Sequence, residues 1–243
     1  ALLLAISMVL VLCACGGGGK KKAFEKAKAA YEAIDKAYEG TNLISTRIYE
    51  AWYQCVKNGA EIEKLAKDKK GDEAIAYLAD EIDIKKEYMI AGGRQALYSA
   101  LGVSPDNLPE NTKEQIESII SVYDKNPDTA FAIIEVINGT LKKNLTKADF
   151  VVSATIFGIK EAGITDEIQA LLDEAKGIMK EMSEKYSDYE HYTNLKGYYT
   201  TASSFFDYCQ HPKGSFDQNA DTMNEYRNKA RDYQADLSFI FED

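Results

Sequence analysis

The chain has 243 residues, of which 39 are acidic and 29 are basic, so its formal net charge is −10 at neutral pH. Proteins that bind nucleic acid carry a basic footprint, and this acidic balance therefore argues against a nucleic-acid partner. The length is enough to bury a sizeable core, in one domain or in two small ones.

The chain begins with a run of mostly apolar residues from Ala1 to Leu12. A helix needs roughly 18 to 20 apolar residues to cross a bilayer, whereas about 7 to 15 are typical of the hydrophobic region of a signal peptide. No basic residue precedes the run, so the sequence indicates a signal peptide that lacks its start.

The residues Leu12-Cys13-Ala14-Cys15 follow directly. They resemble the lipobox of bacterial lipoproteins, with Leu at −3, a small residue at −1 and Cys at +1, although Cys13 is not the typical residue at −2. The resemblance implies that residues 1–14 are removed as a signal peptide and that Cys15 carries the lipid, as diacylglyceryl with further acyl chains such as palmitate. Two or three chains, at about 0.8 kcal/mol per buried CH₂, hold a protein stably on a membrane. The resemblance therefore implies that the protein is anchored in a bacterial cell membrane, on its extracytoplasmic face.

Four glycines and three lysines come next, from Gly16 to Lys22. Glycine-rich segments behave as flexible coil, so residues 15–22 are expected to be a lipidated Cys with a short tether. Residues 23–243 are then expected to form an all-α extracytoplasmic domain.

The first half of this body has a helical period. Apolar residues recur at steps of three and four from Phe24 to Cys55, which predicts one long helix that continues through Gly40. A second helix is predicted over about residues 72–101, with Gly92-Gly93 as a kink or a close-packing point. A loop follows between Ser104 and Pro109.

The second half contains several helix-start signals. Thr112 with Gln115 and Thr146 with Asp149 are typical of capping boxes, and Asn126 before Pro127 is typical of a cap. Thr165 is predicted to cap a longer helix that extends to about Tyr189 or continues to Cys209. A last helix is predicted over Met223 to Ile240. The apolar runs 131–137 and 150–157 are expected to be central.

No segment alternates with the period of a strand and carries hairpin signals. We therefore expect an all-α fold, an antiparallel bundle of about seven helices with long helices near both ends of the chain. Cys55 and Cys209 remain once the signal peptide and the lipidated Cys are set aside. They either form a disulfide, which this location permits, or pack as reduced apolar side chains.

One segment begins like a calcium-binding EF-hand loop. It places oxygen-bearing side chains at four ligand positions, Asp124, Asn126, Asp128 and Glu135. The sixth position is Thr129 where the loop needs Gly, and the start of a helix already accounts for Asn126 and Asp128. The sequence favours that structural role over a metal site.

Catalytic patterns are absent from the sequence. Only His191 and His211 are available, and no motif of a serine or cysteine nucleophile or of a phosphate-binding loop occurs. We expect no enzyme activity and no cofactor.

Eight aromatic residues crowd the segment 186–208, and on one unbroken helix they would point in almost every direction. Either Gly197 interrupts the helix, or some rings are exposed to a partner. Tyrosine suits interfaces because it combines an apolar ring with a polar tip. The second alternative makes Tyr192, Tyr198 and Tyr199 contact residues.

These observations predict a membrane-anchored, extracytoplasmic lipoprotein that acts as a non-enzymatic helical binding module. Its partner would be a protein of the cell envelope or an extracellular ligand. A receptor that captures a small ligand for a transporter is one alternative and predicts a deep pocket between helices. An enzyme of unrecognised type is another and predicts converging acids or amides.

Overall fold

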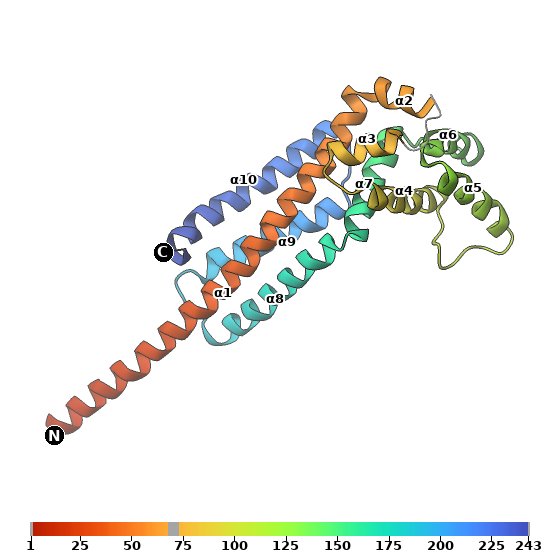
Figure 1. Ribbon diagram of the computed structural model, residues 1–243. Coiled ribbons are helices and arrows are strands. Elements are labelled where there is room, and N and C mark those ends of the chain that lie inside the picture. Colours follow the sequence, from red (N-terminus) through yellow and green to blue (C-terminus); the bar gives the residue numbers. More distant parts are fainter. Residues whose placement is uncertain (1, 68–72, 243) are drawn as a thin grey trace. The chain divides into compact units, whose positions relative to one another are not determined.

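The computed structural model describes the backbone of residues 2–67 and 73–242 and the side chains of residues 19–65 and 73–242. Regular structure in this part is helical, apart from one isolated bridge between Ser104 and Asn107. The elements are α1 (Leu2–Lys57), α2 (Gly59–Lys67), α3 (Glu73–Glu81), α4 (Lys86–Leu101), α5 (Lys113–Lys125), a 3₁₀ turn η1 (Pro127–Thr129), α6 (Ala130–Leu141), α7 (Lys147–Glu161), α8 (Ile164–Lys185), α9 (Tyr192–Gln210) and α10 (Phe216–Phe241) (Figure 1). The predicted all-α class is confirmed, and the predicted number of about seven helices is too low.

Two interruptions that the sequence pattern hides explain part of the difference. Asp83 has φ of 52°, and the N–H groups of Asp83 and Ile84 donate to the carbonyls of Asp80 and Ala79. This pair of bonds is a Schellman motif, which ends α3 without the usual glycine. The predicted helix over 165–209 likewise divides, because two successive turns at Tyr186 and Tyr189 separate α8 from α9.

The helix-start signals differ in outcome. The capping box of Thr146 and Asp149 is formed in both directions, and the Asn126 side chain accepts the N–H of Asp128. Thr112 is the N-cap residue of α5, as predicted, but the capping box is not formed, since the Thr112 hydroxyl donates to the carbonyl of Pro109. Thr165 is also not a cap, because α8 already begins at Ile164.

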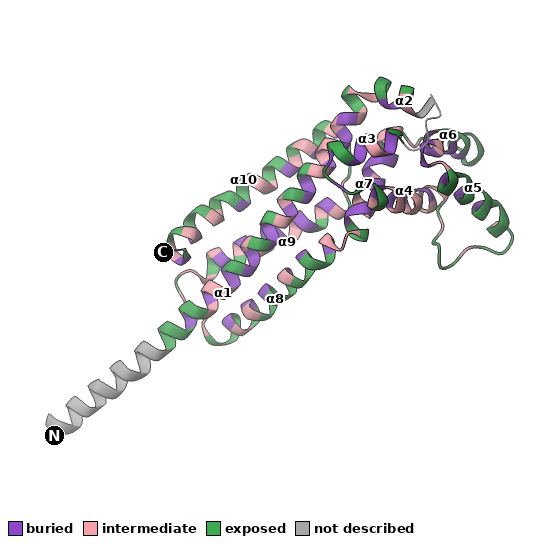
Figure 2. Cartoon of the chain, in the orientation of Figure 1, coloured by how far each residue is buried: buried purple, intermediate pink, exposed green. Residues whose placement is uncertain are grey.

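The chain divides into two compact units. Unit 1 comprises Ala1–Thr41, Glu167–Tyr208 and Asp221–Asp243, and unit 2 comprises Asn42–Asp166 and Cys209–Ala220. The helix α1 contributes its residues up to Thr41 to unit 1 and its remaining residues to unit 2. Each unit has buried residues of its own (Figure 2).

Unit 1 is an antiparallel bundle of α1, α8, α9 and α10. The α1 residue Lys26 pairs with Glu181 of α8, whereas Gly40 lies against Ile168, so these two helices run in opposite directions. The rings of α1 contact those of α9 in the same order along both helices, from Tyr31 with Tyr198 to Tyr38 with Phe205. They meet α10 in reverse order, so α1 and α9 run parallel to each other and antiparallel to α8 and α10.

Unit 2 is built from shorter helices around the crossing of α4 and α7. At this crossing, a Cβ on Gly92 would lie 2.1 Å from the carbonyl oxygen of Ala154 and 2.5 Å from the backbone nitrogen of Gly158. Gly92 therefore marks a close approach of two backbones, which is the packing alternative predicted for Gly92-Gly93. The apolar runs of α6 and α7 are largely buried, as predicted.

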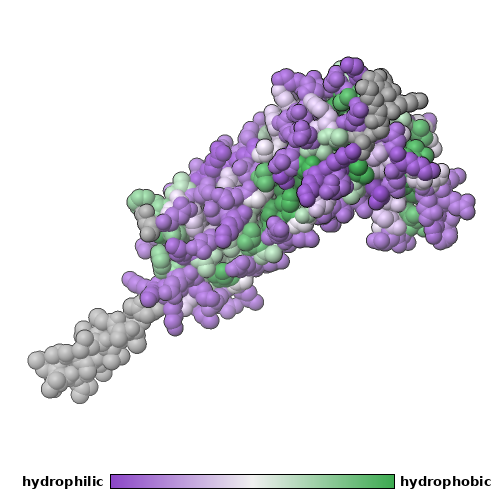
Figure 3. Space-filling view, in the orientation of Figure 1, coloured by the Kyte–Doolittle hydropathy of each residue, from purple (hydrophilic) through white to green (hydrophobic). Residues whose placement is uncertain are grey.

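The surface is rich in charge, and hydrophilic residues dominate the face shown in Figure 3. Among the described residues, no helix combines the length and the apolar character that are needed to cross a bilayer. Residues Gly19 to Lys22 lie within α1, so this part of the predicted tether is helical and not coil.

Candidate functional site

The lipidation site predicted at Cys15 lies outside the residues whose side chains the structure describes. The three predicted contact tyrosines are described, and they differ. Tyr198 is fully buried, so it does not belong to an exposed contact surface, while Tyr192 and Tyr199 are half-buried. None of the eight rings between 186 and 208 is fully exposed, because the break between α8 and α9 lets each segment turn its own face inward.

Tyr198 belongs to the core of unit 1. Its hydroxyl donates to Asp35 at 2.7 Å, and the same carboxylate oxygen accepts the amide of Gln234 at 2.7 Å. Burial, together with the hydrogen bond to Asp35, raises the pKa of Tyr198 far above its usual range. Gly197 does not break the helix, since it lies within α9 and Tyr233 packs where a side chain would be. This cluster is structural.

No disulfide joins Cys55 and Cys209, so the bridge alternative is wrong in this structure. Cys209 is buried, and burial raises the pKa of the Cys55 thiol to about 12. Both side chains pack as apolar groups in unit 2, which is the other alternative that the sequence left open.

The calcium candidates do not converge. Asp124 pairs with Arg94 at 2.8 Å, and Glu135 projects into solvent. Asp128 is buried and accepts the N–H groups of Ala74 and Ile75 at 3.2 Å, so it caps the start of α3. Within residues 19–65 and 73–242, no cluster of three His, Cys, Asp or Glu side chains is placed to hold a metal ion.

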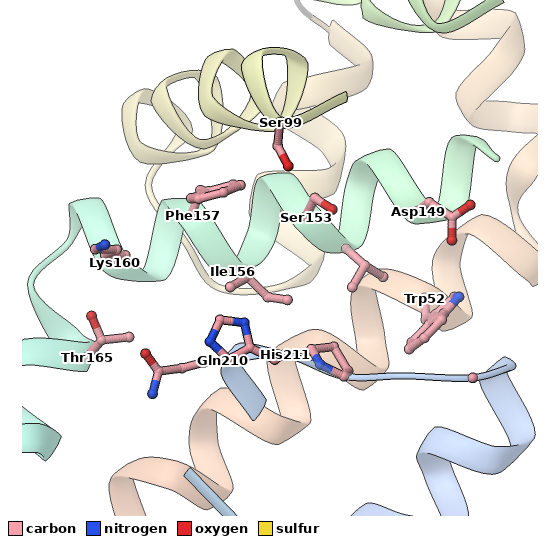
Figure 4. A pocket seen from close by; sticks show the side chains of 13 residues that line it. Trp52, Ser99, Asp149, Ser153, Ile156, Phe157, Lys160, Thr165, Gln210 and His211 are labelled. Carbon is pink, nitrogen blue, oxygen red and sulfur yellow. The ribbon is translucent and has the colours of Figure 1, made fainter. Parts of the chain in front are cut away.

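The most varied side-chain chemistry lines an open groove of about 460 Å³ in unit 2 (Figure 4). This volume lies within the range of about 300 to 1,000 Å³ that is usual for ligand sites. Its walls come from α1, α4, α7, the start of α8, and the end of α9 with the turn that follows. The lining residues are Trp52, Ser99, Asp149, Val152, Ser153, Ile156, Phe157, Lys160, Thr165, Gln210, His211, Pro212 and Gly214.

The floor of the groove is one face of α7. Residues at positions 149, 152, 153, 156 and 160 follow steps of three and four, so they share a stripe along the helix. The acid Asp149 begins the stripe, apolar and hydroxyl side chains occupy the middle, and the base Lys160 ends it. Both charges are exposed to solvent.

Helix chemistry explains part of this pattern, since acids stabilise helix starts and bases stabilise helix ends. The Oδ2 atom of Asp149 accepts the N–H and the hydroxyl of Thr146 at 2.7 and 2.8 Å. Its Oδ1 atom has no hydrogen-bond partner within the described residues, and Lys160 forms no ion pair there. The groove therefore keeps an acceptor at one end and a cation at the other.

Thr165 adds an observation that helix chemistry does not explain. Its side chain lines the groove and is 6% exposed, and its hydroxyl has no hydrogen-bond partner among the described residues. A buried hydroxyl without a partner costs about 1 to 3 kcal/mol. It lies at the Lys160 end of the groove, together with Gln210 (Figure 4).

Sequence patterns alone do not predict this groove. The run 150–157 was expected to be central because it is apolar on more than one face, yet Ile156 and Phe157 are only half-buried. The pattern that could have indicated a polar face on this helix is the helical spacing of Asp149, Ser153 and Lys160. Nothing in the residues around His211 shows that the segment following α9 approaches α7.

Comparison with known protein families, curated proteins and solved structures finds no match for the chain. What this protein does must therefore be inferred from the groove itself. It offers apolar area with a few donors, acceptors and charges, which is the composition of a binding site. His211 is exposed and forms no hydrogen bond to an acid or hydroxyl of the described residues.

Proposed function

We propose that this protein is a membrane-anchored, extracytoplasmic lipoprotein that works as a non-enzymatic binding module, with the groove of unit 2 as its binding site. The resemblance of residues 12–15 to a lipobox supports the anchor. The observation that carries the binding role is a groove of mixed polarity with the exposed carboxylate of Asp149 at one end and the exposed cation of Lys160 at the other.

The binding site is tested by photo-cross-linking in intact cells. A photoreactive phenylalanine replaces Ser99, which is exposed and lines the groove, and the same residue replaces the exposed Ser121 on α5 as the matched control. We expect adducts, identified by mass spectrometry, at Ser99 and not at Ser121. Equal labelling at both positions would count against the groove as the binding site.

The anchor needs a separate test, because it rests on different residues. Mass spectrometry of the membrane fraction should find a lipid on Cys15, and the Cys15→Ser variant should move to the soluble fraction. An unmodified Cys15 in the native protein would remove the membrane part of the proposal.

The shape of the groove also bears on the receptor alternative. Receptors that capture a small ligand usually bury most of its surface, whereas this groove is open along one side. An open groove suits an elongated occupant better than a compact one.

A further inference from the structure

The groove of unit 2 has opposite charges at its two ends. Asp149 and Lys160 are eleven positions apart on α7, which at about 1.5 Å per residue separates them by about 16 Å along the helix axis. Asp149 lies on the side of Trp52, and Lys160 lies on the side of Thr165 and Gln210 (Figure 4). An occupant that pairs with both charges must carry a cation and an anion about this distance apart.

The length of this gap selects the size of the occupant. An extended chain covers at most about 3.3 to 3.6 Å per residue, so a single amino acid is far too short and about five residues suffice. A free peptide of this length has an ammonium group at one end and a carboxylate at the other. The tail of a folded protein would supply only one of the two.

The middle of the groove fits the body of such a peptide. Ile156, Phe157 and Pro212 offer half-buried apolar area for side chains. Ser153 and Gln210, in the same lining, offer groups that can bond peptide amides. A sugar would instead need an open aromatic face for stacking, and Trp52 is only 9% exposed.

Building on the proposed function, we infer that the groove binds a free oligopeptide of about five residues. Its amino terminus pairs with Asp149, and its carboxylate pairs with Lys160. This assignment gives a partner to the Oδ1 atom of Asp149 and to the Lys160 cation, which the described residues leave without one.

The test is calorimetric titration of the full chain in detergent micelles with the pentapeptide Ala-Leu-Ala-Leu-Ala, with free and with blocked termini. We expect the free peptide to bind and amidation of its carboxylate to weaken binding about tenfold, since a charged hydrogen bond is worth about 1.5 to 3 kcal/mol and ~1.4 kcal/mol is tenfold. Acetylation of the amino terminus should weaken binding to a similar extent. Equal affinity of free and doubly blocked peptides overturns the inference.

Variants assign each terminus to its partner. Lys160→Met should weaken the free peptide about tenfold and leave the amidated peptide unchanged, because the two changes remove the same contact. Asp149→Asn should likewise weaken binding of the free peptide and leave binding of the acetylated peptide unchanged. Circular dichroism first shows that the helices of this variant are intact. The matched control Lys113→Met removes an exposed lysine of α5 and should have no effect.

The remaining outcomes separate this inference from the proposed function. If Lys160→Met weakens the amidated peptide as much as the free one, Lys160 does not pair with the carboxylate. If no pentapeptide binds while Ser99 still yields specific adducts in cells, the oligopeptide assignment is wrong and the binding groove stands. If neither experiment is positive, both are wrong.

Discussion

The helices of the two units pack together in opposite ways. Unit 1 fills the space between long helices with large aromatic side chains, and its core contains Tyr31, Tyr38, Tyr198 and Phe205. Unit 2 brings α4 and α7 together until their backbones almost touch, at Gly92 and Gly158. The packing of unit 1 therefore depends on large side chains that fit together. The packing of unit 2 depends on glycines, which have no side chain and let the two helices approach closely.

The polar groups of the two cores differ as well. In unit 1 the tyrosine tips bond to carboxylates, since Tyr198 donates to Asp35 and Tyr31 donates to Glu242 at 2.6 Å. In unit 2 a buried carboxylate, Asp128, serves a helix start that is distant in sequence. The comparison indicates that unit 1 tolerates small changes of volume better than the crossing of unit 2, and that unit 1 is the more sensitive to the loss of a hydroxyl.

The largest effect should come from Gly92→Ala at the crossing of α4 and α7. The new methyl group would meet backbone atoms at 2.1 and 2.5 Å, and backbone cannot move aside as a flexible side chain can. We expect a loss of about 3 kcal/mol in the free energy of unfolding, at the upper end of the cost of overpacking. Urea unfolding followed by fluorescence of Trp52, the single tryptophan and a residue of unit 2, measures it.

Gly139→Ala is the matched control, because a Cβ at this exposed position of α6 meets nothing within 4 Å. It should stabilise the protein by roughly 0.5 to 1 kcal/mol through helix propensity. If both substitutions have the same sign, the close approach of α4 and α7 does not limit the stability of unit 2.

In unit 1 the corresponding change is Tyr198→Phe, which removes a hydroxyl and keeps the ring. Asp35 would lose its bond from Tyr198, and we expect a cost of about 1 to 3 kcal/mol. Tyr199→Phe, at the neighbouring half-buried position, should change stability by less than about 0.5 kcal/mol. Hydrogen exchange of the α9 amides reports on unit 1 directly, and equal exchange in the two variants would contradict the role of the Tyr198 hydroxyl.

Sequence patterns predicted what depends on neighbouring residues along the chain. The all-α class, the continuation of α1 through Gly40 and the capping box of Thr146 with Asp149 are all confirmed. Each of these features involves positions that are within a few residues of one another, so helical spacing and cap chemistry are sufficient.

Features that depend on distant residues were not predictable in this way. Asp128 caps α3 across 54 positions of sequence, and its pattern resembled the start of a calcium loop instead. The Schellman motif at Asp83 was hidden because a non-glycine residue takes the left-handed conformation. The groove was missed for the same reason, since α4, α7 and the end of α9 form it together.

Alkaline pH should sharpen the contrast between the units. Burial, as the larger cause, raises the pKa of Tyr31, Tyr38 and Tyr198 in unit 1, and of Tyr123 in unit 2. A raised pKa means that the folded chain keeps a proton which the unfolded chain loses above about pH 10. The stabilisation is therefore complete below about pH 10 and is lost as the pH rises toward the folded pKa.

For Tyr198 alone this loss amounts to about 1.4 kcal/mol at one pH unit above the unfolded value. The free energy of unfolding, measured by urea titration from pH 9 to pH 11, should fall less in Tyr198→Phe than in the native protein, by about 1.4 kcal/mol at pH 11. Tyr199→Phe should retain the native slope. Since three of these four tyrosines belong to unit 1, protection of α9 amides should decline with pH before that of α4 amides. Identical slopes in Tyr198→Phe and the native protein would mean that a proton on this hydroxyl does not stabilise the aromatic core.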